Sequence, residues 1–229
     1  MKEIVHLASV HNRTDNRVFY KQCVDLAASG FNVRLVVADG KGNAVCQNVS
    51  ILDFSYCSLK SRLFRLFFVS PIVVIKALKL RGDLYHIHDP ELLFYFILFA
   101  PFFSPKKLVF DMHENLSEQV KSKPWIPSFL RATLSASIKL YENIVFRYVP
   151  VIFAEDSYSK SFPNVMNYET VLNFPKSSWA ENTASRAKAK EEPIIGYVGR
   201  IGVDRGADIL LASVVAINKS GRRLRLVLL

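Results

Sequence analysis

The chain alternates short runs of apolar, often β-branched residues with longer segments in which apolar positions recur every three or four residues. The short runs are typical of strands and the longer segments of helices. Residues 32–38 are apolar at almost every position, as in a parallel strand buried on both faces. We predict strands at 4–9, 32–38, 49–52, 84–87, 107–112, 151–154, 170–172, 194–198 and 223–229, and helices at 21–29, 70–80, 91–103, 127–148 and 206–218.

Strands that alternate with helices in this order predict an α/β fold with a doubly wound parallel sheet. Residues 176–192 depart from the pattern, because they are rich in Ser, Ala, Lys and Glu and contain few apolar residues. We therefore expect a linker at 176–192, between a first domain at 1–175 and the start of a second, incomplete domain at 193–229. The second part is a single βαβ unit at most, which predicts marginal stability.

Residues 83–91 contain the polar motif around which the first domain is expected to be organised. Pro90 ends a predicted strand because it has no N–H to donate to a sheet, and the acid after it suits the first turn of a helix. His88 and Asp89 therefore lie at the carboxyl end of a strand, the edge where open α/β sheets bind ligands. We predict that His88 lies at this exit and not in the packed interior. The alternative is that His86 and His88 face opposite sides of the strand and that one of them is packed in the core.

Two further polar clusters are expected at strand ends of the first domain. They are His11, Asp15 and Arg17 after the first strand, and Asp111, His113 and Glu114 at the end of the strand at 107–112. Because the ends of parallel strands share one edge of a sheet, we expect all three clusters to open into the same cleft. Such side chains supply a general base, hydrogen bonds to hydroxyl groups and an Arg for anionic groups.

A metal site is an alternative interpretation, since His-x-His followed by Asp is similar to the ligand runs of some hydrolases. We predict no metal, because the sequence shows no clear further set of His or Cys ligands and Pro90 indicates a turn.

Residues 196–206 form a glycine-bearing segment between a predicted strand and a predicted helix. Backbone N–H groups of such a loop and the dipole at the helix N-terminus bind anions. Arg200 and Arg205 add positive charge beside it. The dinucleotide fingerprint, Gly-x-Gly-x-x-Gly with an acid on the next strand, is not present.

The net charge of +10 at pH 7 indicates an acidic partner or surface. Between Asp53 and Asp83 there is no acid, whereas basic residues are interleaved with Leu, Phe and Ile at Lys60, Arg62, Arg65, Lys76, Lys79 and Arg81. No helix-turn-helix, RNP-like or zinc-finger pattern is present, so we predict no nucleic acid partner. A basic face beside apolar side chains favours attachment to an anionic membrane surface. A solvated basic face is the alternative.

The 3 cysteines are an odd number without paired spacing, which predicts a reduced, cytoplasmic protein. The first residues lead directly into a strand, so we expect no signal peptide. The longest apolar run, at 92–103, would be about 18 Å long as a helix, too short for a hydrocarbon core of about 30 Å. We therefore expect a cytoplasmic protein that is peripheral at the inner face of the membrane.

In combination these motifs resemble those of retaining glycosyltransferases of family 4, which have the two-domain GT-B architecture. The resemblance covers essentially the whole chain and is most specific at 85–93, 110–115 and 195–206. It implies a Rossmann-like first domain that mainly binds the acceptor and a second domain that binds the donor. It implies a nucleotide-diphosphate sugar as substrate, no cofactor and no metal.

The resemblance also implies roles for individual residues. His88 matches the histidine that lies near the transferring sugar. Gly199, Arg200 and Arg205 match the segment that clamps the donor diphosphate, with Arg205 in place of the usual Lys, which keeps the charge but changes the hydrogen-bond geometry. The acceptor side would be lined by His11, Asp15, Arg17, Asp89, His113 and Glu114.

The chain departs from the family pattern in two places. The loop after the first strand, usually glycine-rich, carries His11, Arg13, Asp15 and Arg17, and the family's pair of glutamates would lie beyond Leu229. We therefore expect a glycosyltransferase, or a truncated part of one, that transfers a sugar with retention to a membrane-associated glycan or lipid acceptor, as in polysaccharide biosynthesis. The alternative is the non-catalytic acceptor-binding half of a split enzyme, with a second polypeptide that completes the donor domain.

Overall fold

The computed structural model describes residues 1–54, 62–103, 107–123, 126–177, 193–199, 201–202 and 205–229. The chain divides into two compact units, Met1–Pro175 and Lys176–Leu229, which are described separately. Most of the linker predicted at 176–192 lies outside the described residues.

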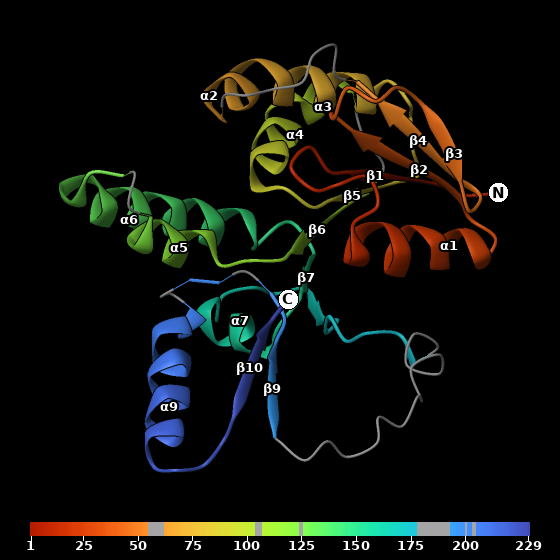
Figure 1. Ribbon diagram of the computed structural model, residues 1–229. Coiled ribbons are helices and arrows are strands. Elements are labelled where there is room, and N and C mark those ends of the chain that lie inside the picture. Colours follow the sequence, from red (N-terminus) through yellow and green to blue (C-terminus); the bar gives the residue numbers. More distant parts are fainter. Residues whose placement is uncertain (55–61, 104–106, 124–125, 178–192, 200, 203–204) are drawn as a thin grey trace. The chain divides into compact units, whose positions relative to one another are not determined.

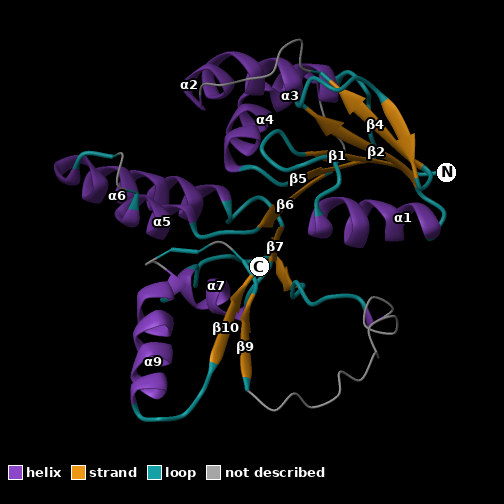
Figure 2. Ribbon diagram, in the orientation of Figure 1, coloured by secondary structure: helices purple, strands orange, loops and turns teal. Residues whose placement is uncertain are grey.

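The large unit is built on an eight-stranded sheet with the order β3-β4-β2-β1-β5-β6-β7-β8 (Figures 1 and 2). Every neighbouring pair is parallel except β3 and β4. The predicted α/β class with a doubly wound parallel sheet is therefore confirmed. The strands are β1 (Glu3–Leu7), β2 (Asn32–Val37), β3 (Ala44–Cys46), β4 (Val49–Asp53), β5 (Leu84–Ile87), β6 (Leu108–Met112), β7 (Val151–Phe153) and β8 (Tyr168–Thr170).

Successive strand residues point to opposite sides of this sheet, and both sides are apolar. Helices therefore cover both faces. Val5 and Leu7 of β1 pack in one core cluster with apolar residues of α3 and α4. The next residue along the chain, Ala8, packs in a second cluster with Val18 and Phe19 of η1. Figure 1 shows α1 on the opposite side of the sheet from α3 and α4. The helices of this unit are η1 (Asn16–Cys23), α1 (Val24–Ala28), α2 (Arg62–Phe64), η2 (Arg65–Val69), α3 (Ser70–Leu78), α4 (Pro90–Phe103), α5 (Leu116–Ser122), α6 (Ser128–Val145) and α7 (Asp156–Ser161).

The helix predicted to begin with Ser70 as its N-cap begins earlier, so that prediction is wrong. Ser70 has helical dihedral angles, and its backbone N–H donates to the carbonyl of Arg65, five residues before it. The wider π-type turn of η2 lets the helix continue through Pro71, which has no N–H to give to a regular α-helical turn.

The small unit consists of β9 (Ile194–Tyr197), α9 (Ala207–Lys219) and β10 (Arg225–Leu228). Its two strands pair in parallel, with Ile194 opposite Arg225 and Tyr197 opposite Leu228. The sequence predicted this single βαβ unit. Within the part of the chain that the structure describes, no helix is both long enough and apolar enough to cross a membrane.

Hydrogen exchange should be much faster in β9 than in β1. Ile194 and Ile195 remain 42% and 36% exposed, whereas Val5 and Leu7 are fully buried. A two-stranded sheet leaves both edges unpaired and buries too little apolar area to offset about 1–2 kcal/mol of backbone entropy per residue. We expect the amides of Ile194–Tyr197 to exchange through low-energy opening, as measured by native-state exchange with mass spectrometry. Equal protection of the two strands would contradict this expectation.

Candidate polar site at the carboxyl edge of the sheet

All 5 histidines of the chain gather at the carboxyl edge of the large unit's sheet. The rings of His6, His86 and His88 form a triangle, with centroids 4.6, 4.5 and 5.3 Å apart. The ring of His113 lies 5.4 Å from that of His88, and the ring of His11 lies 4.7 Å from that of His113. Three neighbouring elements place them: His6 lies on β1, His86 and His88 lie on β5 and just after it, and the other two follow β1 and β6.

Strand geometry places the inner three rings on one face of the sheet. His6 is opposite His86 in the parallel β1–β5 pair. His88 lies two residues after His86, and strand residues two apart point to the same side. The interpretation that His86 and His88 face opposite sides is therefore wrong. Their side of the sheet is the one that η1 covers, because Asp111 on the same face contacts Arg17 of that helix.

His88 is buried, with no exposed side-chain surface, so the expectation that it lies outside the packed interior is wrong. The ladder continues past β5, because the His88 N–H donates to the Leu7 carbonyl at 3.0 Å. The His88 Nε2 atom lies 3.0 Å from His6 Nδ1, and its Nδ1 atom lies 3.2 Å from His113 Nε2. Burial lowers the pKa of His88 to about 4, and it also lowers the pKa of His6 and His86 well below the ordinary value. These three imidazoles are therefore neutral near pH 7.

Asp111 of β6 is the central anion of the cluster and is completely buried. The Arg17 guanidinium donates to both of its oxygens, at 3.1 and 2.7 Å, and Gln22 donates at 2.6 Å. Burial alone would raise the pKa of Asp111, but hydrogen bonds from His113, His88 and Arg17 hold it well below the ordinary value. Asp111 is therefore a carboxylate that is fixed from several sides.

Arg17 is a buried residue that joins Asp111 to another part of the large unit. Only 4% of the residue is exposed, and its third guanidinium nitrogen donates to the Val171 carbonyl at 2.8 Å. Asp15, predicted beside it on the acceptor side, is the N-cap of η1 and accepts from the N–H groups of Arg17 and Val18. Both residues therefore help to fix η1 against the sheet, and their roles toward an acceptor stay predictions.

Asp89 fixes the loop after β1 and orients His11. Its Oδ2 atom accepts from the N–H and hydroxyl of Ser9 and from the N–H of Val10, and its Oδ1 atom lies 2.8 Å from His11 Nδ1. Burial lowers the pKa of His11, but the hydrogen bond and charge of Asp89 outweigh it, so the net pKa is raised. The side chain of His11 is 23% exposed. This histidine is therefore an oriented, readily protonated group at the surface.

The structure thus brings together the polar side chains that the sequence predicted at this edge of the large unit. His11, His113 and Glu114 reach solvent, whereas His88, Asp89, Asp111 and Arg17 form the buried support beneath them. Sequence reasoning missed His6 and Gln22. A signal for His6 was available, since a histidine within an apolar strand needs a polar partner on its own face of the sheet.

Two groups of side chains at this edge have an arrangement that could hold a metal ion. One is His6, His86 and His88, and the other is His88, Asp111 and His113. The further ligands that the sequence did not show beside His88 are therefore supplied by β1 and by the end of β6.

The predicted diphosphate segment lies in the small unit. Gly199 is exposed, with a φ of +135°, and Gly206, with a φ of +71°, is the N-cap of α9. Arg205 is exposed one residue before that cap, and Arg200 lies outside the described residues. Glycine suits both positions, because side chains rarely tolerate these dihedral angles.

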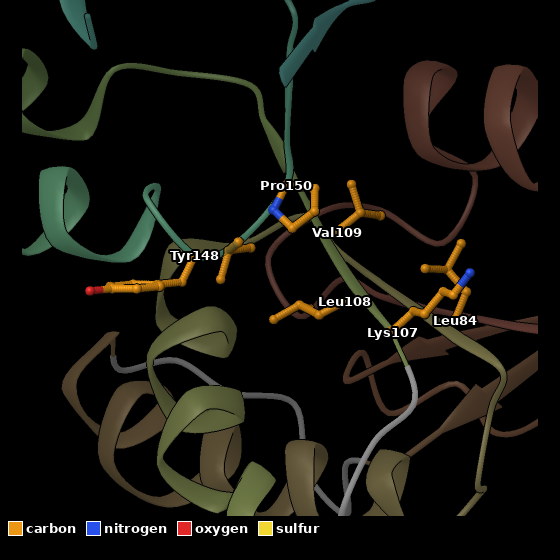
Figure 3. Close-up of a pocket in the computed structure, with 7 residues that line it drawn as sticks. Leu84, Lys107, Leu108, Val109, Tyr148 and Pro150 are labelled. Atoms are coloured by element: carbon orange, nitrogen blue, oxygen red, sulfur yellow. The ribbon is translucent and has the colours of Figure 1, made fainter. Parts of the chain in front are cut away.

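The amino edge of the large sheet carries a different feature, an open hollow of about 430 Å³ (Figure 3). It is lined by Leu84, Lys107, Leu108, Val109, Tyr148, Val149 and Pro150, at the start of β5 and β6 and just before β7. Lys107 is the only ionisable group in this lining besides the Tyr148 phenol. With no acid or base pair converging on it, the hollow offers no chemistry like that of the opposite edge.

No protein-family model and no curated protein sequence matches the chain. Solved structures do match it. Sucrose-phosphate synthase from Thermosynechococcus elongatus aligns over 100% of this chain and 62% of its own, with a TM-score of 0.71 and 15% identity. A glycosyltransferase from Rickettsia africae aligns over 99% of this chain and 68% of its own, with a TM-score of 0.54 and 12% identity. At these identities the likeness shows a shared fold, and the chain spans less than two thirds of the first of these proteins.

Proposed function

We propose that the chain is a glycosyltransferase, or the acceptor-side part of one, that uses a nucleotide-diphosphate sugar as donor. The observation that carries this proposal is the oriented polar cluster at the carboxyl edge of a sheet whose fold is shared with two proteins named as a synthase of sucrose phosphate and a glycosyltransferase. Ligands of open α/β sheets bind at this edge. Sugar acceptors and donors are rich in hydroxyl groups, which such histidines and carboxylates bind.

On the acceptor side, His11, His113 and Glu114 are the side chains that reach solvent and can contact hydroxyl groups. Asp89 fixes the ring of His11, so a hydroxyl bound there is held in one orientation. We assign His88 a positioning role, because it lies beneath His113 and has no exposed surface. We propose that His88 acts on the transferring sugar through His113, whose Nε2 atom lies 3.2 Å from His88 Nδ1.

On the donor side, Gly199, Arg200, Arg205 and the N-terminus of α9 would neutralise the leaving diphosphate. Retention of configuration is carried over from the family resemblance. The resemblance also calls for a further sheet that carries two glutamates, which we propose is supplied by additional polypeptide. We propose that the transfer needs no separate cofactor.

The experiment that tests the proposed function is a screen of common nucleotide sugars for release of the nucleotide diphosphate. The 229-residue chain is assayed alone and together with a candidate second polypeptide that carries the two glutamates, with a lipid extract as acceptor. We expect release with one donor in the presence of both polypeptides and little or none with the chain alone. Binding of the acceptor without release under any condition would favour the alternative, a non-catalytic acceptor-binding half.

We further propose that the acceptor is membrane-associated and that the large unit binds an anionic membrane surface. Phe64, Phe67 and Phe68 of α2 and η2 are 48–60% exposed, and the rings of Phe64 and Phe68 stack at 5.0 Å. Basic residues flank them in the sequence, although Arg65 also pairs with Glu91 at 3.2 Å. Lys60 and the side chain of Arg62 lie outside the described part of the chain. Aromatic side chains beside basic ones are what peripheral attachment needs.

Binding to anionic vesicles should occur and should weaken as salt is added, because screened charge supplies much of the attraction. Replacing Phe67 and Phe68 by Ser should reduce binding, and replacing Lys60, Arg62 and Arg65 by Ser should release the protein. The matched control is Phe129→Ser on α6, since Phe129 is 76% exposed and belongs to another helix. Co-sedimentation measures all of these variants. Equal binding to neutral and anionic vesicles would contradict the proposal.

A further inference from the structure

Three histidines of the carboxyl edge are joined by two nitrogen-to-nitrogen contacts. The His6 Nδ1 atom lies 3.0 Å from His88 Nε2, and the His88 Nδ1 atom lies 3.2 Å from His113 Nε2. Both separations are hydrogen-bond distances. Strand pairing sets this arrangement, because β5 lies between β1 and β6 and the three rings are on these strands or just after them. We call His6, His88 and His113 the histidine series.

Each contact of the histidine series holds a single proton, and this couples the three rings. A neutral imidazole carries its proton on one nitrogen and a lone pair on the other. Burial lowers the pKa of His6 and His88, so both rings are neutral near pH 7. If His88 is protonated at Nδ1, His6 must donate from Nδ1 and His113 must accept at Nε2. If His88 is protonated at Nε2, the protons of His6 and His113 both lie on Nε2. Only these two arrangements of neutral rings make both hydrogen bonds.

Asp111 does not decide between the two arrangements. Its Oδ2 atom already accepts from Gln22 at 2.6 Å and from Arg17 Nε at 3.1 Å. The same oxygen lies 3.4 Å from His88 Nδ1 and 3.3 Å from His113 Nε2, farther than either nitrogen-to-nitrogen contact of the series. In each arrangement one of these two nitrogens presents a proton to the carboxylate and the other presents a lone pair. The carboxylate therefore favours the two arrangements about equally.

The two ends of the histidine series differ, and this difference decides. His6 is completely buried, and its Nε2 atom has no hydrogen-bond partner among the described residues. A proton on that atom would be a buried N–H without an acceptor, whereas buried acceptors without a donor are better tolerated. At the other end, the side chain of His113 is 15% exposed, so its proton has access to water or a ligand. The favoured arrangement therefore keeps the proton of His6 on Nδ1.

We propose that His6 and His88 hold the neutral ring of His113 in the tautomer that carries its proton on Nδ1. The two buried histidines are then positioning residues that fix a proton as well as a ring. His88 engages Nε2 of His113, so Nδ1 is the nitrogen left for a ligand, and there it is a hydrogen-bond donor. The consequence for sugar transfer rests on the proposed function: neutral His113 donates to an oxygen of the sugar or acceptor and does not take the proton of the acceptor hydroxyl.

The test reads the tautomers in the free protein, so its outcome does not depend on whether the protein transfers sugar. The 229-residue chain is labelled with isotope-enriched histidine, and long-range proton–nitrogen correlation spectra are recorded at alkaline pH, where ordinary imidazoles are neutral. In each ring the pattern of correlations identifies the nitrogen that carries the proton. We expect the proton on Nδ1 in His6, His88 and His113. A neutral His113 protonated at Nε2 would overturn the proposal.

His88→Phe removes the N–H from which His113 accepts. The Nε2 atom of His113 then faces the Asp111 carboxylate, which repels a lone pair, so we expect the proton to move from Nδ1 to Nε2. His11→Gln is the matched control, since the His11 ring lies 4.7 Å from that of His113 but makes neither contact of the series. It should leave the proton on Nδ1. An unchanged tautomer in folded His88→Phe, or a changed one in His11→Gln, would overturn the proposal. If His88→Phe does not fold, the wild-type spectrum alone decides.

Discussion

Replacing Asp111 with Ala is expected to destabilise the large unit by about 3–5 kcal/mol, because it leaves a buried guanidinium without its counter-charge. Arg17 is only 4% exposed and gives two hydrogen bonds to this carboxylate. Gln22 and the two nearest histidines would lose an acceptor in the same step. Denaturant unfolding, followed by circular dichroism, measures the change.

The matched control is Asp39→Ala, which removes the nearer of two carboxylates beside Arg13. That pair lies near the surface, with side-chain exposures of 13% and 22%. Arg13 keeps the Asp53 carboxylate 3.8 Å away, so the loss of Asp39 should cost less than the loss of Asp111. If Asp111→Ala cost no more than Asp39→Ala, the buried cluster would not be the electrostatic centre of the unit.

His11→Ala is expected to lower sugar transfer by about 10–100-fold while the large unit stays folded. The lost contribution is one oriented hydrogen bond to the acceptor, worth about 1.5–3 kcal/mol when one partner is charged. The unit should stay folded because His11 is partly exposed and Asp89 still accepts from Ser9 and Val10. The buried Asp89 carboxylate loses one partner, which costs about 1–3 kcal/mol. The control is Asn12→Ala, because Asn12 is the exposed neighbour of His11 in the same loop.

Steady-state transfer rates at saturating donor, measured with increasing acceptor, separate weaker acceptor binding from slower reaction. A large drop in melting temperature of His11→Ala would identify it as a structural residue. An unchanged rate would remove it from the proposed acceptor side.

The pattern of apolar residues was sufficient to predict the sheet, because parallel strands buried on both faces are nearly continuous apolar runs. The strand predicted at 84–87 is β5 with the same bounds. The clustering of Asp89, His113 and His11 was also predictable, since strand exits share an edge. The short elements β3, α5 and α7 were missed, because segments of 3–7 residues carry little periodic signal.

The burial of His88 was not predictable from its position beside Pro90. It depends on two facts that the sequence does not contain: β1 is the neighbour of β5, and η1 covers this face of both strands. The same adjacency places His6 opposite His86 and supplies a polar partner for His88. Likewise, Ser70-Pro71 has the composition of a helix start, but the preceding π-type turn lets an existing helix continue through it.

We propose that the chain takes part in sugar transfer at the edge where His11 and His113 lie. A radiolabelled sugar is followed from each of several nucleotide-diphosphate donors into a lipid-extract acceptor, using the chain together with a candidate second polypeptide that carries the two glutamates. We expect label from one donor to enter the lipid fraction, and His11→Ala to reduce this label about 10–100-fold. Failure of label to move from any donor, or transfer that His11→Ala leaves unchanged, would contradict this proposal.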